Sequence, residues 1–463
     1  MYIGRYRPLT VSESVIYIAT DRLYARRLRL YGGYNHMPSM ERMADSGTLF
    51  RNATATAGST IMTHACEWSG RYPAELHVDV PFEERDYLNF LPKQDSVFHD
   101  FLDMGYNVYI VLVENLTDKP TTTNGKITAF AQGYDSFRPN WNLWPEEANI
   151  VKLPGIGRSG AESVRRKDQI MRAAELVDAS EKEGKPAFVF VKCHGYNKPE
   201  YRAEFLRYAG QQRVTDDDLY NCEIDEGLGC LLDHFDYPRN KNGPTIWFAS
   251  DHGSWAGEGF RHHYGYHLHQ EIVHVPLIGS RGDGKVIDSV FSMKEVRRII
   301  TDNSPKMGER YIFAETLYPG QITQKPDDGV LSTARIMVRL NRYKYIYSMH
   351  GVEGDGNPCE EMYDLAYDPR EKFNLAAAFT HAHKDVARPP ESGPPFHHVS
   401  SRINSNPKKA LMPETLPKKR GDVEFKNTFQ LSGWHEIHRI LLGLRSQARS
   451  HWKKTGRGEF FKF

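Results

Sequence analysis

Two short segments of the chain place acidic and imidazole side chains where a metal ion could bind. Asp21 directly follows the apolar run SVIYIAT (residues 14–20), and Asp251 and His252 directly follow TIWFAS (residues 245–250). A carboxylate and an imidazole at a strand end can turn toward one cation, because the backbone leaves the sheet there. The simpler interpretation is an aspartate that caps the following helix. Each segment alone therefore predicts little, and the prediction depends on further residues.

A third segment, GSTIMTH (residues 58–64), carries several hydroxyl groups and precedes SGRYP (residues 69–73). Small hydroxyl residues after Gly58 suit the capping of a helix N-terminus. Alternatively, one of them is a nucleophile, because the backbone N–H groups and the dipole of a helix N-terminus favour an anion. These residue types alone leave both interpretations open.

The elements that must position these residues are apolar strands that alternate with helices. VYIVLV (108–113), AFVFVK (187–192) and the two runs above are β-branched or aromatic and apolar on both faces, which is typical of strands buried under helices. The segment that begins at Pro38 and stops at Gly47 has a helical period. The alternation predicts an α/β fold with a mostly parallel sheet covered on both faces. Chemistry then gathers at the carboxyl ends of the strands.

Composition narrows the class of protein. The chain has 463 residues, of which 40% are hydrophobic and 26% charged, as expected of a globular enzyme domain with a smaller attached one. The formal net charge of +1 argues against a protein that coats nucleic acid. We find no apolar run of transmembrane length and no signal-peptide pattern. The 5 cysteines lack metal-type spacing, which indicates reduced thiols and predicts a cytoplasmic protein.

The C-terminal part of the chain is basic. Residues 401–463 contain fourteen Lys or Arg and five Asp or Glu, and the Pro-rich stretch ARPPESGPPFHHVSS precedes them. We predict a linker and basic tail over residues 387–463. An amphipathic helix in this tail packs on its own domain, contacts a partner subunit or lies on an anionic membrane, and we expect a homo-oligomer formed through the tail. Its apolar face comprises Trp434, Ile437, Leu441, Leu444, Ala448 and Trp452.

The order of these segments resembles the sulfatase family of the alkaline phosphatase superfamily. The matching pieces are IYIATDRLYARRLRLYG, MERMADSGTLFRNATATAGST, SGRYP, FASDHG followed by HLHQEIVHVPLIG, and RLNRYKYIYSMHG with EEMYDLAYDPREKFNLA. They span residues 14 to 376 in the order of the family. The resemblance implies an alkaline-phosphatase-like α/β/α sandwich as a catalytic domain over residues 1–330. It also implies a small C-terminal subdomain over residues 331–386.

The chain departs from the family at the nucleophile. Sulfatases have a Cys or Ser there, in a C/S-x-P-x-R motif, and oxidise it to formylglycine. Counting back from SGRYP places Thr60 at this position, with Met62 and His64 where the family has Pro and Arg. Threonine carries a Cβ methyl group and cannot become that aldehyde. Thr60 instead resembles the nucleophile of the phosphoryl-transferring branch, which includes phosphonate monoester hydrolase-like phosphodiesterases and phosphoethanolamine transferases.

The resemblance to that branch implies one divalent metal ion. Its ligands match Asp21, Thr60, Asp251 and His252 residue by residue. A mixed set of oxygen and nitrogen ligands suits Mn²⁺ or Zn²⁺, with Ca²⁺ or Mg²⁺ as alternatives. A cation on the Thr60 hydroxyl would lower its pKa and hold it for in-line attack on phosphorus.

Other site residues are inferred from loops of the family. The family often has a general-acid histidine where Asn197 stands, so we predict that His194 in the same loop takes this role, with a surface-loop histidine as the alternative. In the histidine-rich run at residues 261–269, His263 lies closest to a family position that contacts the transferred group. A hydrogen-bonded core histidine is the alternative for His64. The predicted substrate-binding residues are His64, Lys192, Asn197 and His262.

These observations predict a metal-dependent phosphoryl-transfer enzyme that acts on a small anionic ester. The substrate is a phosphodiester, a phosphonate ester or a phosphomonoester, and the reaction passes through a phospho-Thr60 intermediate. One alternative is a sulfatase or sulfamate hydrolase that works without formylglycine. Another is a catalytically lapsed relative that acts as a binding or assembly protein.

Overall fold

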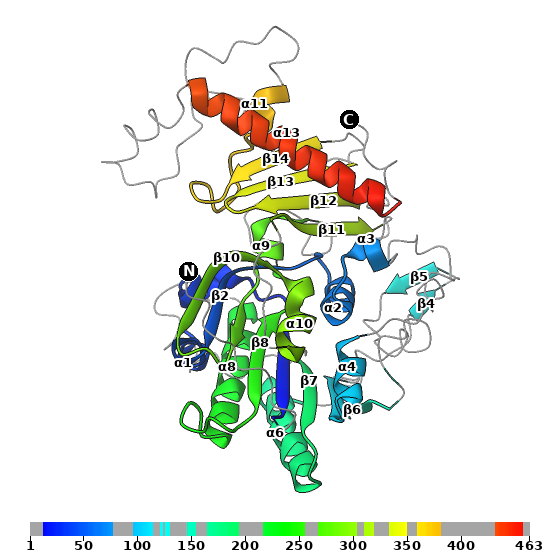
Figure 1. The fold of residues 1–463 in the computed structure, drawn as a ribbon, viewed down its shortest axis with the longest axis vertical. Coiled ribbons are helices and arrows are strands. Elements are labelled where there is room, and N and C mark those ends of the chain that lie inside the picture. Colours follow the sequence, from blue (N-terminus) through cyan, green and yellow to red (C-terminus); the bar gives the residue numbers. More distant parts are fainter. Residues whose placement is uncertain are drawn as a thin grey trace. The chain divides into compact units, whose positions relative to one another are not determined.

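The chain folds into two compact units (Figure 1). The computed structural model describes residues 13–76, 96–113, 121–123, 126–129, 145, 147–153, 164–193, 216–254, 267–302, 310–318, 333–349, 359–380 and 431–456. The first unit comprises Met1–His267 and Glu271–Glu309, and the second comprises Leu268–Gln270 and Arg310–Phe463. The predicted boundary between residues 330 and 331 lies in a stretch outside the described residues.

The first unit is built on an eight-stranded sheet in the order β10-β2-β9-β8-β1-β7-β3-β6. Neighbouring strands run parallel except where β9 pairs with β2 and β8. The mostly parallel sheet predicted from the sequence is therefore confirmed. Its strands are β1 (Val15–Thr20), β2 (Thr48–Thr54), β3 (Asn107–Val113), β6 (Asn149–Leu153), β7 (Ala187–Cys193), β8 (Thr245–Ser250), β9 (Leu277–Gly279) and β10 (Lys285–Ser292), and β4 (Thr121–Thr123) and β5 (Lys126–Ala129) form a separate two-stranded ribbon.

The central strands of this sheet form from the four apolar runs of the sequence. Every residue of β1, β7 and β8 is buried, as expected for strands covered on both faces. β1 lies between β7 and β8, and its last residue, Thr20, pairs in register with Cys193 and Ser250. The three strands therefore end at the same edge of the sheet.

Helices cover both faces of the sheet because successive residues of a strand point to opposite sides. Ile16 and Ile18 of β1 belong to one apolar cluster with residues of α1, α6 and α8. Phe190 of β7 instead contacts Trp68 of α2 and Phe98 of α4 through ring edges. The helices of this unit are α1 (Pro38–Ser46), α2 (Thr60–Ser69), α3 (Pro73–Leu76), α4 (Val97–Asp103), α6 (Arg166–Lys182), α8 (Asp216–His234) and α10 (Val296–Thr301), and α9 (Gln270–Val273) spans the change of unit.

The second unit is a four-stranded antiparallel sheet with one long helix. The sheet has the order β11-β12-β13-β14, and α13 packs against β12 and β13. Its strands are β11 (Ile312–Tyr318), β12 (Thr333–Leu340), β13 (Tyr343–Ser348) and β14 (Cys359–Asp364), and its helices are α11 (Ala377–Thr380) and α13 (Leu431–Lys454).

The amphipathic helix of the tail buries its apolar face within this second unit. Leu441, Leu444, Ala448 and Trp452 of α13 lie in one buried cluster with Tyr347 and other residues of the sheet. Of the interpretations of this helix, packing on its own domain is therefore confirmed. The predicted linker and the segment before α13 lie in residues 381–430, outside the described residues.

A search for membrane-spanning helices gives a negative result for the part of the chain that the structure describes: none is long and apolar enough. None of the five cysteines forms a disulfide.

Candidate active site

The candidate site forms where β1, β8 and the start of α2 meet. Because β1 and β8 are parallel and in register, Asp21 and Asp251 leave the sheet side by side, and the Asp251 N–H donates to the Thr20 carbonyl at 3.2 Å. Thr60 is the first residue of α2. The two aspartate-tipped strands and the hydroxyl-rich helix start are thus brought together, as the sequence predicted.

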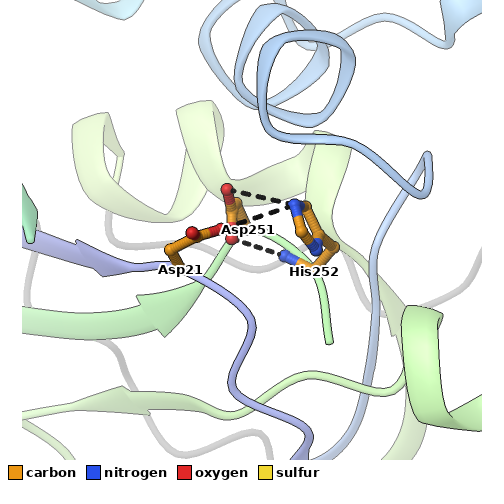
Figure 2. A group of neighbouring side chains, drawn as sticks. All are labelled: Asp21, Asp251 and His252. Carbon is orange, nitrogen blue, oxygen red and sulfur yellow. Dashed lines mark hydrogen bonds and ion pairs between the residues drawn. The ribbon is translucent and has the colours of Figure 1, made fainter. Parts of the chain in front are cut away.

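Thr60 Oγ1 lies next to two members of the predicted ligand set. It is 3.0 Å from His252 Nε2 and 3.4 Å from Asp21 Oδ1. His252 Nε2 in turn lies 3.5 Å from Asp21 Oδ1 and 3.7 Å from Asp251 Oδ2. Figure 2 shows the two carboxylates and the imidazole converging.

This donor set fits a divalent ion. One donor atom from each of Asp21, Asp251 and His252 lies within 4.8 Å of the others, and Asp251 and His252 are fully buried. A buried carboxylate such as that of Asp251 is costly, with a second carboxylate close by, unless a cation or other partner compensates it. Two carboxylates, an imidazole and a hydroxyl are ligands suited to Mn²⁺ or Zn²⁺.

Local contacts prepare the His252 ring for ligation. Its Nδ1 lies 2.7 Å from the Gly253 carbonyl oxygen, so Nδ1 carries a proton, and in the neutral ring the lone pair of Nε2 is available to a metal ion or to the Thr60 hydroxyl. Gly253 is required at the next position, because a Cβ atom there would lie 1.9 Å from the carbonyl oxygen of Glu271. Close packing against the backbone at Glu271 therefore explains the glycine of the Asp-His-Gly segment.

Lys192 lies beneath the site rather than facing solvent. Its side chain is fully buried, and its ammonium group is 2.6 Å from Asp251 Oδ2 and 3.3 Å from the Thr20 carbonyl oxygen. Burial alone would raise the pKa of Asp251, but the positive charges of the His252 ring in its protonated form and of the Lys192 ammonium outweigh burial and hold this pKa well below its usual range. Lys192 was predicted as a substrate contact, and in the structure its ammonium is bound to a metal-ligand candidate.

His64 also lies behind the ligands, in a buried pair with Glu67. His64 Nδ1 is 2.8 Å from Glu67 Oε2, its Nε2 is 3.8 Å from Asp251 Oδ2, and its ring stacks on Trp68. Burial and the nearby Lys192 ammonium lower the pKa of His64, whereas burial and the Asp251 carboxylate raise the pKa of Glu67. Both directions favour a neutral pair. Predicted as a substrate contact, His64 is placed by the structure as a fully buried neighbour of Asp251.

The hydroxyl-rich segment of the sequence forms the start of α2. Ser59 is the N-cap residue in an extended conformation, and its side chain makes no capping hydrogen bond. Its carbonyl accepts from the Thr63 N–H at 3.0 Å, and the Thr63 hydroxyl donates to the Ala57 carbonyl at 3.3 Å. The Thr60 hydroxyl faces the ligand cluster.

Four predicted site residues lie outside the described residues. His194 and Asn197 belong to the stretch 194–215, and His262 and His263 belong to 255–266. Their roles stay predictions.

Two residues that contact the candidate site were not predicted from the sequence. Glu67 follows His64 by three residues, a spacing that pairs side chains on a helix and that offered a signal. Ser250 has no such signal in the sequence, although its hydroxyl accepts from the Leu23 N–H at 3.0 Å and donates to the His252 carbonyl at 2.8 Å.

An α/β/α domain with a cluster of side chains that could hold a metal ion, at the carboxyl ends of its parallel strands, is the class that this fold and site define. Residues 13–287, more than half of the chain, match the family model described as Sulfatase, and the chain belongs to this family of hydrolases. The family typically depends on a divalent metal ion. No curated protein sequence matches the chain.

Several solved structures have a similar fold. The phosphonate monoester hydrolase of Agrobacterium radiobacter is 16% identical with a TM-score of 0.55, over 80% of this chain and 93% of that one. The phosphonate monoester hydrolase SpPMH from Silicibacter pomeroyi is 14% identical with a TM-score of 0.53, over 80% and 92%. BT4656, solved with its substrate D-glucosamine-2-N,6-O-disulfate, is 13% identical with a TM-score of 0.54, over 81% and 95%. At these identities the similarity shows the alkaline-phosphatase-like fold alone.

Proposed function

We propose that this chain is a metal-dependent phosphoryl-transfer enzyme with Thr60 as its nucleophile. The observation that carries the proposal is the place of Thr60 Oγ1, at a helix N-terminus and 3.0 Å from His252 Nε2. The substrate class is a phosphodiester, a phosphonate ester or a phosphomonoester. Threonine supports phosphoryl rather than sulfuryl transfer, because it cannot be converted to formylglycine.

Asp21, Asp251, His252 and the Thr60 oxygen would hold one divalent ion. When bound, such an ion lowers the pKa of a ligating hydroxyl and offsets negative charge on a substrate oxygen. Lys192 and the backbone N–H of His252, which donates to Asp251 Oδ1 at 2.8 Å, fix the Asp251 carboxylate. The Gly253 carbonyl fixes the His252 ring through Nδ1.

In the reaction, the Thr60 hydroxyl loses its proton to water, and its oxygen attacks phosphorus. The bond from phosphorus to the ester oxygen breaks, and its electron pair leaves on that oxygen, which takes a proton from a general acid. A new bond joins Thr60 Oγ1 to phosphorus. Water or an acceptor alcohol then attacks phosphorus and loses a proton, the bond from phosphorus to Thr60 Oγ1 breaks with its electron pair on Oγ1, and Thr60 regains a proton. The backbone N–H groups at the start of α2 favour the anionic group throughout.

We assign the general acid to His194, which lies three residues before Asn197, the position where the family often has a histidine, and we expect His263 near the transferred group. Replacing His194 with glutamine should slow esters with poor leaving groups much more than 4-nitrophenyl esters, because a good leaving group needs little protonation. Equal loss on both kinds of ester would contradict this role.

One observation favours a second candidate function, sulfate ester hydrolysis without formylglycine. A relative of the same fold was solved with a sulfated sugar as its substrate, and sulfate and phosphate esters are both tetrahedral oxyanions. A panel of 4-nitrophenyl phosphate, phenylphosphonate, bis-phosphate and sulfate esters, assayed with Mn²⁺ or Zn²⁺, separates the two. Faster sulfate than phosphoester turnover would overturn the ranking.

The metal requirement is tested on the same panel. We expect chelation to abolish turnover and added Mn²⁺ or Zn²⁺ to restore it. Asp251→Asn should lower bound metal, measured by elemental analysis, whereas Asp288→Asn should not, because the Asp288 side chain is 68% exposed and pairs with Arg51. Turnover that persists without bound metal would contradict the proposal.

A further inference from the structure

Arg22 directly follows the ligand candidate Asp21 and reaches toward it. Its Nε lies 3.4 Å from Asp21 Oδ2. The Arg22 side chain is 25% exposed and the Asp21 side chain 12% exposed. The Arg22 side chain is therefore both beside the ligand candidates and partly exposed to solvent.

Two other basic side chains next to the cluster, among the residues that the structure describes, do not reach solvent. Among the described residues that border the ligands, Lys192 and His64 have fully buried side chains. Lys192 contacts Asp251, and His64 contacts Glu67. An anion that approaches the ligands from solvent therefore meets Arg22 before these two groups.

The backbone presents Arg22 in an unusual conformation. Its φ angle is 61°, in the left-handed region that side chains other than Gly, Asn and Asp adopt only at a cost. Hydrogen bonds on both sides impose this conformation: the Thr20 carbonyl accepts from the Asp251 N–H, and the Leu23 N–H donates to Ser250 Oγ. Further along, the Ala25 N–H donates to the His274 carbonyl. A glycine would meet the backbone requirement more easily, so the arginine side chain has a use of its own.

We propose that Arg22 binds the non-bridging oxygens of the substrate's tetrahedral anion. This inference rests on the proposed function and adds a substrate-binding residue to it. A guanidinium group suits the task, because it is planar, stays charged and donates paired N–H groups to an oxyanion. The ion pair with Asp21 holds the guanidinium group close to the candidate ligands.

Binding of inorganic phosphate and vanadate to metal-loaded protein tests the inference. Arg22→Asn is the main variant, because asparagine accepts the left-handed conformation and so keeps the fold while removing the charge. Arg22→Lys keeps the charge but loses the paired donors. The matched control is Arg51→Asn, which removes an arginine with a 51% exposed side chain and an ion pair to Asp288.

We expect Arg22→Asn to weaken phosphate binding about 10- to 100-fold, the loss of a charge-assisted hydrogen bond. Arg22→Lys should lie between Arg22→Asn and wild type, and Arg51→Asn should match wild type. Bound metal per chain, measured by elemental analysis, should not change in any of them. Calorimetric titration of phosphate provides the affinities.

Two results would overturn the inference while the proposed function stands. One is unchanged phosphate affinity in Arg22→Asn. The other is loss of bound metal in that variant, which would make Arg22 a support of the ligands instead. If metal-loaded wild type binds neither phosphate, vanadate nor sulfate, the proposed function itself fails and takes the inference with it. If wild type and Arg22→Asn bind phosphate with equal affinity, only the role of Arg22 is contradicted, and the proposed function stands.

Discussion

Lys192→Met should destabilise the metal-free protein strongly. The substitution keeps an unbranched side chain of similar length but removes the ammonium group 2.6 Å from Asp251 Oδ2, where both side chains are 0% exposed. Removing one partner of a buried ion pair costs about 3–5 kcal/mol, because the other charge stays buried without compensation. For a domain of this size 1 kcal/mol corresponds to about 2 °C, so the unfolding temperature should fall by about 6–10 °C.

Two further variants give this prediction its controls. Lys167→Met removes an ammonium group at the same distance, 2.6 Å, from Glu226, but the two side chains are 30% and 42% exposed. Exposed pairs contribute about 0–1 kcal/mol, so this variant should stay close to wild type. Lys192→Met combined with Asp251→Asn removes both charges and should recover part of the lost stability.

The assay is urea or thermal unfolding of chelator-treated protein, repeated with saturating Mn²⁺. A bound ion restores a positive charge beside Asp251, so Mn²⁺ should stabilise Lys192→Met more than it stabilises wild type. The reasoning is refuted if Lys192→Met and Lys167→Met unfold at the same temperature without metal. Should Lys192→Met not fold alone, failure of the double variant to rescue folding would refute it equally.

Two further predictions concern the second unit. Burial alone would lower the pKa of His269, but Glu361, 3.0 Å away, outweighs burial and raises this pKa. The His269 imidazole therefore binds its second proton more tightly in the folded state than in the unfolded state. The stability that protonated His269 contributes is complete below the unfolded pKa of about 6.5 and is lost as the pH rises through the folded pKa. His269→Gln should flatten the pH dependence of urea unfolding above about pH 6.5, and an unchanged slope would contradict this. Leu441→Ala should cost about 2–5 kcal/mol because Leu441 is 1% exposed, whereas Leu442→Ala, at 44% exposure, should stay within about 0.5 kcal/mol; equal losses in unfolding experiments would show that α13 does not pack through this face.

The sheet and the grouping of the candidate ligands could be predicted from the sequence for a simple physical reason. Strands buried on both faces are almost wholly apolar, so β1, β3, β7 and β8 stand out as runs of β-branched and aromatic residues. Their parallel arrangement brings the residues that follow each strand to one edge, which places Asp21 near Asp251 and His252. The order of segments shared with the sulfatase family then supplied Thr60.

The roles of the residues around the candidate ligands could not be predicted from the sequence in this way. Lys192 ends an apolar run, where a lysine usually reaches solvent, and only the position of Asp251 on a neighbouring strand end shows that its ammonium is buried in an ion pair. The conformation of Arg22 depends on Ser250, more than two hundred residues away in the chain. His64 and Glu67 have a helical spacing, but their burial depends on the strands beneath them. Such tertiary pairings leave no periodic signal.

The covalent intermediate tests the central claim most directly. Metal-loaded enzyme is mixed with a 4-nitrophenyl phosphoester, quenched in acid during turnover, digested and examined by mass spectrometry. We predict phosphate on Thr60, no label and no turnover in Thr60→Ala, and partial turnover in Thr60→Ser, which keeps the attacking oxygen. Thr63→Ala is the control in the same helix and should still be labelled. A label on Ser59 or on a histidine, or near wild-type turnover by Thr60→Ala, would contradict Thr60 as the nucleophile.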